Sequence, residues 1–415
     1  MRVAMVSEHA SPLATLGGED AGGQNVHVSG LANALAQKGI EVVVYTRRDD
    51  PLLPRQVSVA PGVTVEHVDA GPARPIPKDE LFAYMPAFAA QLAAEWSLDP
   101  PDLVHAHFWM SGYAAVMAGR PLDIPLIQTF HALGAVKRRH QGNADSSPRE
   151  RLATERAILA TADHIIATCS DEVAELTLLE TDLQRVSVVP CGADLSVFSP
   201  HGPREARRDG LARLVSVGRL VERKGIADAI AALAHVPGCE LVVAGGPPFE
   251  ELAADPEVAR LRTIACQLGV ERRVEFRGRL NHEEVAALMR SADIVVSVPW
   301  YEPFGMTPIE AMACGVPVVG SAVGGLLDTV VNMRTGLLVP PRDPKTLAAA
   351  LEELLGDDRL RAAMGRAGAR RAQARYSWEC VADLTLAVYH WTMGRSRTAP
   401  DLLVPEAGAE ELMVS

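Results

Sequence analysis

Short apolar runs alternate with longer stretches of helical periodicity along most of this chain. Strands that are apolar at nearly every position are typical of a parallel sheet covered on both faces. Between the first two runs, residues 25–39 predict an amphipathic helix that ends at Gly39. The strands predicted in this half of the chain are residues 3–7, 42–46, 103–106, 126–129, 164–167 and 186–189.

The same alternation restarts after a connection rich in Pro and Gly, at about residues 192–210. Strands are predicted at residues 214–217, 241–244, 274–276, 294–298 and 316–319, with helices at 225–234, 258–268 and 282–290. The pattern predicts an α/β fold of two tandem Rossmann-like domains that face a central cleft. We expect an N-terminal domain at 1–195, a C-terminal domain at 196–378, a helix at 379–395 that packs back across both, and a flexible tail at 396–415.

Composition narrows the class of protein. The 40 Lys and Arg against 52 Asp and Glu give a net charge of −12, which argues against a broad nucleic-acid surface. The chain contains no run of about 18 apolar residues, so no membrane span is predicted. The six cysteines form no CxxC pair, so we expect reduced thiols and a cytoplasmic protein. A monomer and a homodimer both stay open.

A glycine-rich stretch, "LGGEDAGGQNVHV", follows the first strand and opens the first helix. It is not GxGxxG, and no isolated acid ends the second strand, so the signal for a dinucleotide is weak. Gly22 and Gly23 either form a tight turn or bring bare N–H groups to an anion at the helix N-terminus.

Two cations follow the first strand of the second half. Arg219 comes just after the predicted strand, and Lys224 lies five residues on, before a helix. Each alone is typical of a solvated surface charge. Together, at the carboxyl end of a strand, they favour a site for a diphosphate.

Two acids border an aromatic, Pro-rich segment, "PWYEPFGMTPIEAMACGVPVV". Glu302 and Glu310 are either a solvated acidic face or acceptors for sugar hydroxyls. The amides of Gly305, Met306 and Thr307 lie where a helix begins and can face a hydroxyl or a phosphate. The aromatic surroundings favour the binding interpretation.

Three histidines, His105, His107 and His131, lie at or just past predicted strand ends. Their spacing is not that of HExxH and neither Cys nor acid completes a ligand set, so no metal site is predicted. His105 is interpreted as a structural hydrogen-bonding residue and His131 as the candidate for the active site. GxSxG, the P-loop motif and a metal-holding DxD are all missing, so a leaving diphosphate must be stabilised by protein cations and helix dipoles.

These motifs together resemble a known family. "GGQNVHV", "VGRLVERKG" and "EPFGMTPIEAMACGVPVV" look like the retaining GT-B glycosyltransferases of family 4, and the resemblance extends over about residues 1–390. The N-terminal segment is similar to two branches, the inositol-phosphate glycosyltransferases of mycothiol synthesis and the sucrose(-phosphate) synthases. The resemblance implies transfer of a hexose or N-acetylhexosamine from a nucleotide-diphospho-sugar, UDP-GlcNAc or UDP-glucose, to a small hydroxylated acceptor. It implies neither a metal nor a cofactor.

The resemblance also assigns roles to residues. Gly23, Arg219 and Lys224 would hold the donor diphosphate, and Glu310 would hold the ribose hydroxyls. The donor sugar would be held by Glu302 with the segment that contains Phe304, Gly305, Met306 and Thr307, and His131 would lie near its C6 hydroxyl. The implied catalytic set is His131, Arg219, Lys224 and Glu302.

The acceptor side departs from the inositol-phosphate branch, which grips a phosphate with Lys, Tyr, Thr and Arg. Lys78 matches the first and Arg151 is placed at the last, but Phe108 and Ala132 replace the Tyr and the Thr. Asn25 is expected to bind an acceptor hydroxyl. The departures imply another polyol, sugar or aminocyclitol, or a sugar phosphate that is bound differently.

Three alternatives stay open. A sucrose-synthase-like enzyme would form or cleave a disaccharide with UDP. A nucleotide-sugar-binding protein would bind the donor without turnover. A dehydrogenase is the most distant, because the glycine loop does not fit one.

Overall fold

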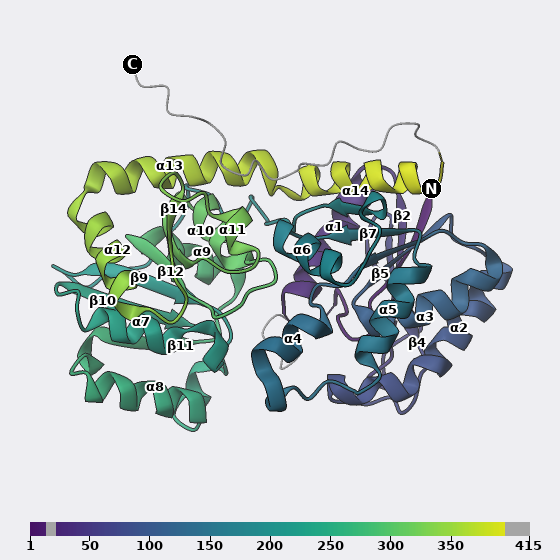
Figure 1. Ribbon diagram of the computed structural model, residues 1–415, viewed down its shortest axis with the longest axis horizontal. Coiled ribbons are helices and arrows are strands. Elements are labelled where there is room, and N and C mark those ends of the chain that lie inside the picture. Colours follow the sequence, from purple (N-terminus) through teal and green to yellow (C-terminus); the bar gives the residue numbers. More distant parts are fainter. Residues whose placement is uncertain (14–21, 395–415) are drawn as a thin grey trace, which may run out of the picture. The chain divides into compact units, whose positions relative to one another are not determined.

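The computed structural model describes residues 1–13 and 22–394, which form two compact units (Figure 1). Within the described chain, the first unit contains residues 1–13, 24–190 and 381–394, and the second contains residues 22–23 and 191–380. Residues 16–21 of the glycine-rich stretch and the predicted tail, residues 396–415, lie outside the described residues. None of the described helices is both long and apolar enough to cross a bilayer.

The first unit is built on an eight-stranded sheet in the order β3-β4-β2-β1-β5-β6-β7-β8. Its inner strands are buried at nearly every residue, which explains their continuous apolar runs. The strands are β1 (Arg2–Val6), β2 (Glu41–Arg47), β3 (Gln56–Ala60), β4 (Val63–Val68), β5 (Leu103–His107), β6 (Leu126–Thr129), β7 (His164–Ala167) and β8 (Val186–Val188).

Two strands of this sheet were missed by the sequence analysis. The edge strand β3 is antiparallel to β4, so the sheet is not wholly parallel, and neither strand was predicted. β3 is largely exposed and carries no apolar run, while β4 holds the buried polar residues Glu66 and His67. Arg55 neutralises Glu66 through an ion pair, which lets a charged residue lie inside the sheet.

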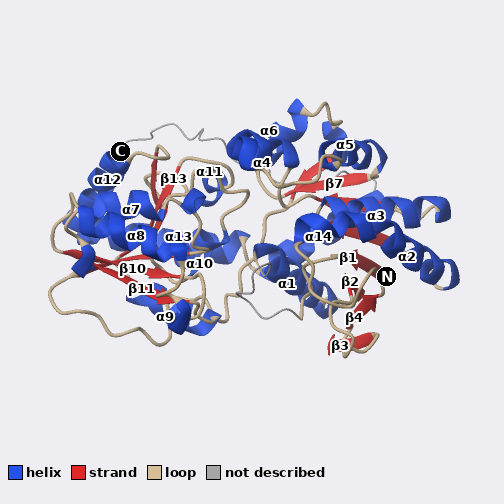
Figure 2. Cartoon of the chain, turned by 90° about the horizontal axis from the view of Figure 1, so that it is seen from below, coloured by secondary structure: helices blue, strands red, loops and turns tan. Residues whose placement is uncertain are grey.

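Helices cover the sheet of the first unit (Figure 2). The first helix ends two residues before Gly39, whose φ of +81° is the left-handed conformation predicted there. The helices are α1 (Gly23–Gln37), α2 (Met85–Leu98), α3 (Trp109–Gly119), α4 (Gly134–Gln141), α5 (Arg151–Thr161), α6 (Ser170–Leu178) and α14 (Trp378–Thr392), the last of which begins in the second unit.

The second unit has a six-stranded, fully parallel sheet in the order β11-β10-β9-β12-β13-β14. Its strands are β9 (Ala212–Val217), β10 (Cys239–Ala244), β11 (Val274–Gly278), β12 (Ile294–Ser297), β13 (Val318–Ser321) and β14 (Gly336–Val339). The short strand β14 was not predicted. The other five lie where their apolar runs predicted them, within a few residues at each end.

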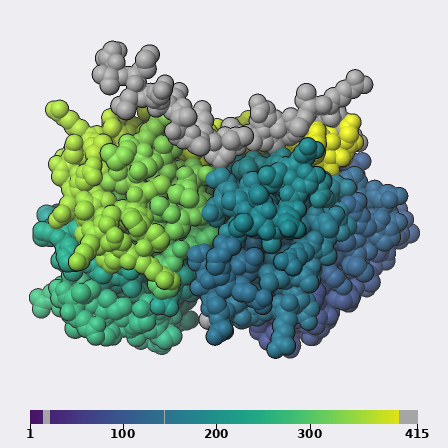
Figure 3. All heavy atoms as spheres, viewed as in Figure 1, coloured from purple at the N-terminus to yellow at the C-terminus, as the bar shows by residue number. Residues whose placement is uncertain are grey.

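Seven helices of the described chain cover this second sheet in two layers. They are α7 (Ile226–Leu233), α8 (Pro256–Gln267), α9 (His282–Ser291), α10 (Met306–Ala313), α11 (Leu326–Thr329), α12 (Pro344–Gly356) and α13 (Asp358–Arg375). Helices α7, α8 and α12 pack together, and α10 packs between α9 and α13. Atoms of the segment that holds α12 and α13 lie on the surface in Figure 3, and the exposed residues of these helices include charged side chains such as Glu352 and Arg366.

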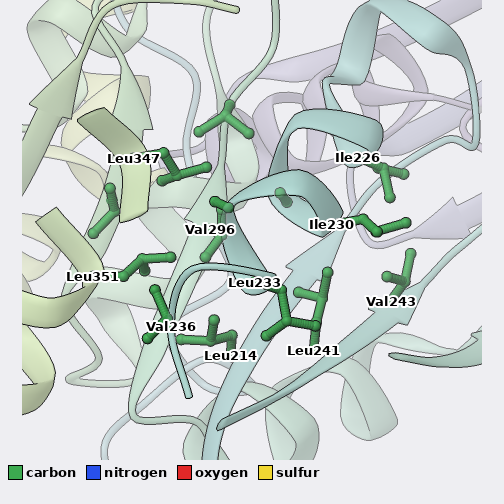
Figure 4. Close-up of a cluster of buried hydrophobic side chains, with 14 of the residues drawn as sticks. Leu214, Ile226, Ile230, Leu233, Val236, Leu241, Val243, Val296, Leu347 and Leu351 are labelled. Carbon is green, nitrogen blue, oxygen red and sulfur yellow. The ribbon is translucent and has the colours of Figure 1, made fainter. Parts of the chain in front are cut away.

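The core of the second unit lies between its sheet and the α7–α12 layer. Burying each of its large aliphatic side chains contributes roughly 1.5–3 kcal/mol. Figure 4 shows Leu214, Leu241, Val243 and Val296 from the strands facing Ile226, Ile230 and Leu233 from α7 and Leu347 and Leu351 from α12.

The strand order defines one special position in each sheet. The chain moves outward from β1 to β2 and from β9 to β10, then returns to the other side of the first strand at β5 and at β12. Ligands of open α/β sheets bind outside the carboxyl ends of the strands at such a switch point. The loops after β1, β5, β9 and β12 are therefore where a site is expected.

Candidate active site

Two loops meet at the switch point of the second unit. The backbone N–H of Trp300, after β12, donates to the carbonyl of Arg223, after β9, at 2.8 Å. Arg223 Nη1 donates back to the carbonyl of Tyr301 at 3.3 Å. These bonds fix the segment of Arg219 and Lys224 against the segment of Glu302.

Three cations act on one carboxylate in these loops. Lys224 Nζ forms an ion pair with Glu302 Oε2, and Arg223 Nη1 lies 4.0 Å from the same oxygen. Burial by itself would raise the pKa of Glu302, but Lys224, Arg223 and Arg219 outweigh it and hold that pKa below its usual value. Glu302 is therefore ionised at neutral pH. The structure brings Arg219, Lys224 and Glu302 together, and it adds Arg223, which the sequence analysis missed although it lies beside Lys224.

A glycine shapes the turn that carries Lys224. Gly225 has a φ of +69° and begins α7, and a Cβ added to it would lie 1.9 Å from the carbonyl oxygen of Val298. Only glycine fits a left-handed turn this close to the neighbouring backbone. The loop after β9 thus lies directly against the loop after β12.

The start of α10 completes this side of the site. Gly305 caps the helix with a φ of +93°, and Thr307 Oγ1 donates to the carbonyl of Val217 at 3.4 Å. The first turn of α10, which contains Met306, thus adjoins the end of β9, and the N–H groups at a helix start can bind an anion. Phe304 is buried and its ring packs against Tyr376 at 6.3 Å, so only its backbone is available to a ligand.

Glu310 lies one turn further along α10, on the same face as Met306. Burial raises its pKa to about 7. Within residues 1–13 and 22–394, no side chain or backbone donor contacts its carboxylate. The carboxylate of Glu310 can therefore accept hydrogen bonds from a ligand.

The switch point of the first unit is closed by the start of α1. Gln24 Nε2 donates to Ser7 Oγ at 3.2 Å, after β1, and to the carbonyl of His107 at 3.3 Å, at the end of β5. Gly23 is the first residue of α1 and is exposed. The predicted anion site at this helix start thus lies beside the loops after β1 and β5.

Glu8 and His9 follow β1 and were missed by the sequence analysis. Glu8 is buried, accepts a hydrogen bond from Ser111 Oγ, and lies 2.7 Å from His9 Nδ1 through its Oε1 atom. The available signal was an acid and a histidine directly after the first strand. The carboxylate fixes the orientation of the His9 ring, which packs edge-on against Phe108 at 5.0 Å.

Three of the predicted acceptor residues gather around one ring. Phe108 has a φ of +81°, and its ring centre lies 5.4 Å from Lys78 Nζ and 5.2 Å from Arg151 Cζ. Both cations are thus within reach of the π face. The structure brings Lys78, Phe108 and Arg151 together.

Arg151 and Asn25 are already engaged by the protein. The buried guanidinium of Arg151 donates to Glu155 Oε1 at 2.8 Å and to the carbonyl of Ala132 at 2.6 Å. Asn25 is buried, and its Nδ2 donates to the carbonyl of Ser11 at 3.0 Å. Arg151 therefore positions the backbone beside Ala132, and Asn25 holds the loop after β1.

The histidines form one cluster. His105 Nδ1 lies 2.7 Å from the hydroxyl of Tyr389 and its Nε2 lies 2.9 Å from Thr129 Oγ1, so it has the structural role expected for it. His131, with a φ of +59°, lies 3.0 Å through Nε2 from His107 Nδ1. His27 of α1 joins them, although it is 80 residues from His107 and the sequence analysis did not group it with the others.

Burial keeps these imidazoles neutral. It lowers the pKa of His27 to about 4 and that of His105 to about 3. It also holds the pKa values of His107 and His131 well below the usual range, with neighbouring histidines adding to the effect. At neutral pH each ring therefore has one N–H and one lone pair.

Comparisons with known proteins agree with this architecture. The family described as Glycosyltransferase Family 4 matches residues 21–219, and Glycosyl transferases group 1 matches residues 202–371. The D-inositol 3-phosphate glycosyltransferase of Acidothermus cellulolyticus is 38% identical over 417 residues, covering 96% of this chain and 92% of the relative. The protein of the same name from Mycobacterium tuberculosis (strain ATCC 25177 / H37Ra) is 39% identical over 409 residues, covering 95% and 84%.

A solved structure gives the same result. Sucrose-phosphate synthase from Thermosynechococcus elongatus superposes with a TM-score of 0.86 at 34% identity, covering 95% of this chain and 100% of that one. The resemblance drawn from the motifs and the fold class predicted from the strand pattern are both confirmed. With two units built on mainly parallel sheets and relatives that align over nearly its whole length, this chain belongs to the GT-B glycosyltransferases of family 4 and is a glycosyltransferase.

Proposed function

We propose that the enzyme transfers a hexosyl or N-acetylhexosaminyl group from a UDP-sugar to a hydroxyl of a small cyclitol, aminocyclitol or sugar, with retention at the anomeric carbon. The observation that carries this proposal is the cluster of Arg219, Arg223 and Lys224 around Glu302, at the switch point between β9 and β12. A diphosphate is the ligand whose charge matches that cluster. The carboxylate of Glu310, which no donor of the described chain contacts, accepts hydrogen bonds from the ribose hydroxyls.

In the proposed reaction the acceptor oxygen forms a bond to the anomeric carbon, on the face from which the nucleotide leaves. The bond from that carbon to the β-phosphate oxygen breaks, and the acceptor proton passes to the departing phosphate. Arg219 and Lys224, with the start of α10, stabilise the charge that develops on the diphosphate. Glu302 and the backbone from Phe304 to Thr307 hold the sugar hydroxyls, so no protein nucleophile is required.

His131 is proposed to lie against the donor sugar, near its C6 hydroxyl. The neutral imidazole is both a donor and an acceptor of hydrogen bonds. Gly23, at the start of α1, is proposed to present its amide to the diphosphate.

We propose that binding of the acceptor depends little on whether it carries a phosphate group. The names of the curated relatives point to inositol 3-phosphate, which is therefore the first acceptor to test. However, Phe108 and Ala132 offer no polar side chain, and the Arg151 guanidinium is engaged by Glu155 and Ala132. Lys78 supplies the cation on this side, and a cyclitol or sugar without phosphate is expected to be used as well.

A second candidate follows from the structural match. The sucrose-phosphate synthase match, at 34% identity over most of both chains, supports a fructose or fructose 6-phosphate acceptor and a disaccharide product. Formation of a UDP-sugar from UDP and a disaccharide would favour this candidate.

The test is a matrix of donors and acceptors. UDP-glucose, UDP-GlcNAc, GDP-mannose and ADP-glucose are each incubated with inositol, inositol 3-phosphate, an aminocyclitol and fructose 6-phosphate. UDP release and the mass of the product are measured. We expect a UDP-sugar to support transfer and Lys224→Ala to lower kcat/KM by at least ~10²-fold, because a stabiliser of transition-state charge is lost.

Lys345→Ala is the matched control, because Lys345 is an exposed residue of α12 in the same unit. Its kcat/KM should equal that of the wild type. UDP binding without transfer to any acceptor would instead indicate a binding protein without turnover. An unchanged rate in Lys224→Ala would remove the proposed diphosphate contact.

A further inference from the structure

Three histidines from different elements of the first unit converge on one point. His27 comes from α1, His107 ends β5, and His131 lies two residues past β6. One ring nitrogen from each lies within 4.8 Å of the other two. The ring centre of His27 lies 5.6 Å from that of His107 and 5.0 Å from that of His131.

Two features of the cluster point to a ligand. His107 Nε2 is buried and has no hydrogen-bond partner in the described chain, an uncommon state for a buried polar atom. His131 adopts a left-handed backbone although it is not glycine, a conformation that persists only where the surroundings impose it. His105, by contrast, is held by Tyr389 and Thr129 and stands behind the cluster.

The spacing suits a first-row transition metal. With Zn–N bonds of about 2.0–2.1 Å, adjacent ligands of a tetrahedral ion lie about 3.3 Å apart. His107 Nδ1 and His131 Nε2 already lie 3.0 Å apart, so the two rings are close enough to share an ion through Nδ1 or through the unpartnered Nε2 of His107. One ring nitrogen of His27 lies within 4.8 Å of a nitrogen of each of the other two rings, and it must come closer to them to complete the coordination.

The donor set also selects the kind of ion. Three neutral imidazoles suit Zn²⁺, Co²⁺, Ni²⁺ or Cu²⁺, whereas Mg²⁺ and Ca²⁺ require oxygen ligands. Three protein ligands leave a fourth position open to water or to an acceptor hydroxyl.

We propose that His27, His107 and His131 form a binding site for a zinc-class divalent ion and that the bound ion inhibits glycosyl transfer. His131, the half-buried member, is the ligand nearest to solvent. Coordination occupies the imidazole that the proposed function assigns to the donor sugar and places a +2 charge beside it. The inhibition rests on the proposed function, whereas the metal binding does not.

The binding test uses the full-length enzyme and the metals alone. Zn²⁺ is titrated against a chromogenic chelator, and Co²⁺ is added to reveal the visible absorption of a tetrahedral nitrogen site. We expect one equivalent to bind, and His27→Ala and His107→Ala each to weaken the affinity by at least 10-fold. His235→Ala, which changes an exposed histidine of the second unit, is the matched control and should bind as the wild type does.

A measurement on the wild type covers the case in which a buried variant fails to fold. X-ray absorption of the zinc-loaded enzyme should show three imidazole nitrogens at about 2.0–2.1 Å. One imidazole or none, or unchanged affinity in folded His107→Ala, would overturn the site.

The activity test then separates the two claims. Zn²⁺ should inhibit transfer at the concentrations at which it binds, a chelator should restore the rate, and Mg²⁺ should have no effect. Zinc bound at the three histidines with an unchanged transfer rate would overturn the inhibition. Zinc bound there in a protein that transfers no sugar to any acceptor would contradict the proposed function and leave the metal site standing.

Discussion

Two carboxylates eight residues apart, Glu302 and Glu310, have pKa values that are shifted in opposite directions. Both Glu302 and Glu310 are partly buried, which by itself raises the pKa of each. Lys224, Arg223 and Arg219 reverse this effect at Glu302, but no cation does so at Glu310, whose pKa lies at about 7. Glu302 is thus fixed as an anion, whereas Glu310 changes charge near neutral pH.

This difference predicts a pH-dependent affinity for the nucleoside. In the proposed role, ionised Glu310 would accept hydrogen bonds from both ribose hydroxyls, so binding should strengthen as the pH rises through about 7. Uridine is the ligand to use, because it lacks phosphates that titrate in the same range. Calorimetry between about pH 5.5 and 8.5 should show a rising affinity for the wild type and a flat one for Glu310→Gln. Equal slopes in the two proteins would contradict the assignment.

The free enzyme should respond to pH in the opposite direction. The folded-state pKa of Glu310 exceeds its unfolded value, so ionisation favours unfolding. The stability associated with the protonated carboxyl is complete below the unfolded pKa and is lost as the pH rises through about 7. Glu310→Gln should therefore raise the melting temperature at pH 8 and not at pH 4.

Residues within one motif could be predicted from the sequence, but residues joined only by the fold could not. Arg219 and Lys224 lie in one short segment, and Glu302 and Glu310 lie in another, so each pair can be recognised from the local sequence. His27 carries no local signal. His27 reads as one more position of an amphipathic helix until the sheet order brings α1 beside β5 and β6.

At the scale of elements, apolar runs predicted the inner strands because both faces of each sheet are covered. Apolar runs did not predict strands that are exposed or that carry polar residues. β3 is an exposed edge, and β4 carries buried polar residues that tertiary contacts satisfy. The partners that make such a strand stable are distant in the sequence, so its own pattern cannot reveal it.

The helix α14 is anchored to the first unit by contacts of unequal weight. Tyr389 is buried and its hydroxyl lies 2.7 Å from His105 Nδ1, whereas Lys38 and Asp383 form a surface ion pair at 2.7 Å. Surface pairs contribute about 0–1 kcal/mol. The buried hydrogen bond is therefore the more important of the two.

Tyr389→Phe should lower the free energy of unfolding by about 1–3 kcal/mol, because it leaves His105 Nδ1 buried and unpaired. Urea unfolding checks this. Tyr113→Phe is the control, since the Tyr113 hydroxyl makes no hydrogen bond within the described chain, and its effect should stay within about 0.5 kcal/mol. A loss no larger than that of the control would mean that α14 is held by apolar packing alone.

At the scale of the whole molecule, an acidic protein is proposed to bind an acidic donor. The net charge of −12 repels a nucleotide at long range, so binding depends on the local cations at the end of β9. Each sheet gathers its candidate residues at its own switch point. The proposed contacts to the nucleotide belong mainly to the second unit, and those to the acceptor belong to the first.

This division predicts where UDP acts. At about 100 times its Kd, UDP should stabilise the unit that binds it by about 2.7 kcal/mol. Hydrogen exchange should slow in residues 218–225 and 300–310, and, apart from the start of α1 near Gly23, the first unit should exchange as it does without ligand. Lys224→Ala should lose this protection at the same UDP concentration, and Lys345→Ala should keep it. Protection centred on β5 and β6 would place the nucleotide in the first unit and refute the proposed division of labour.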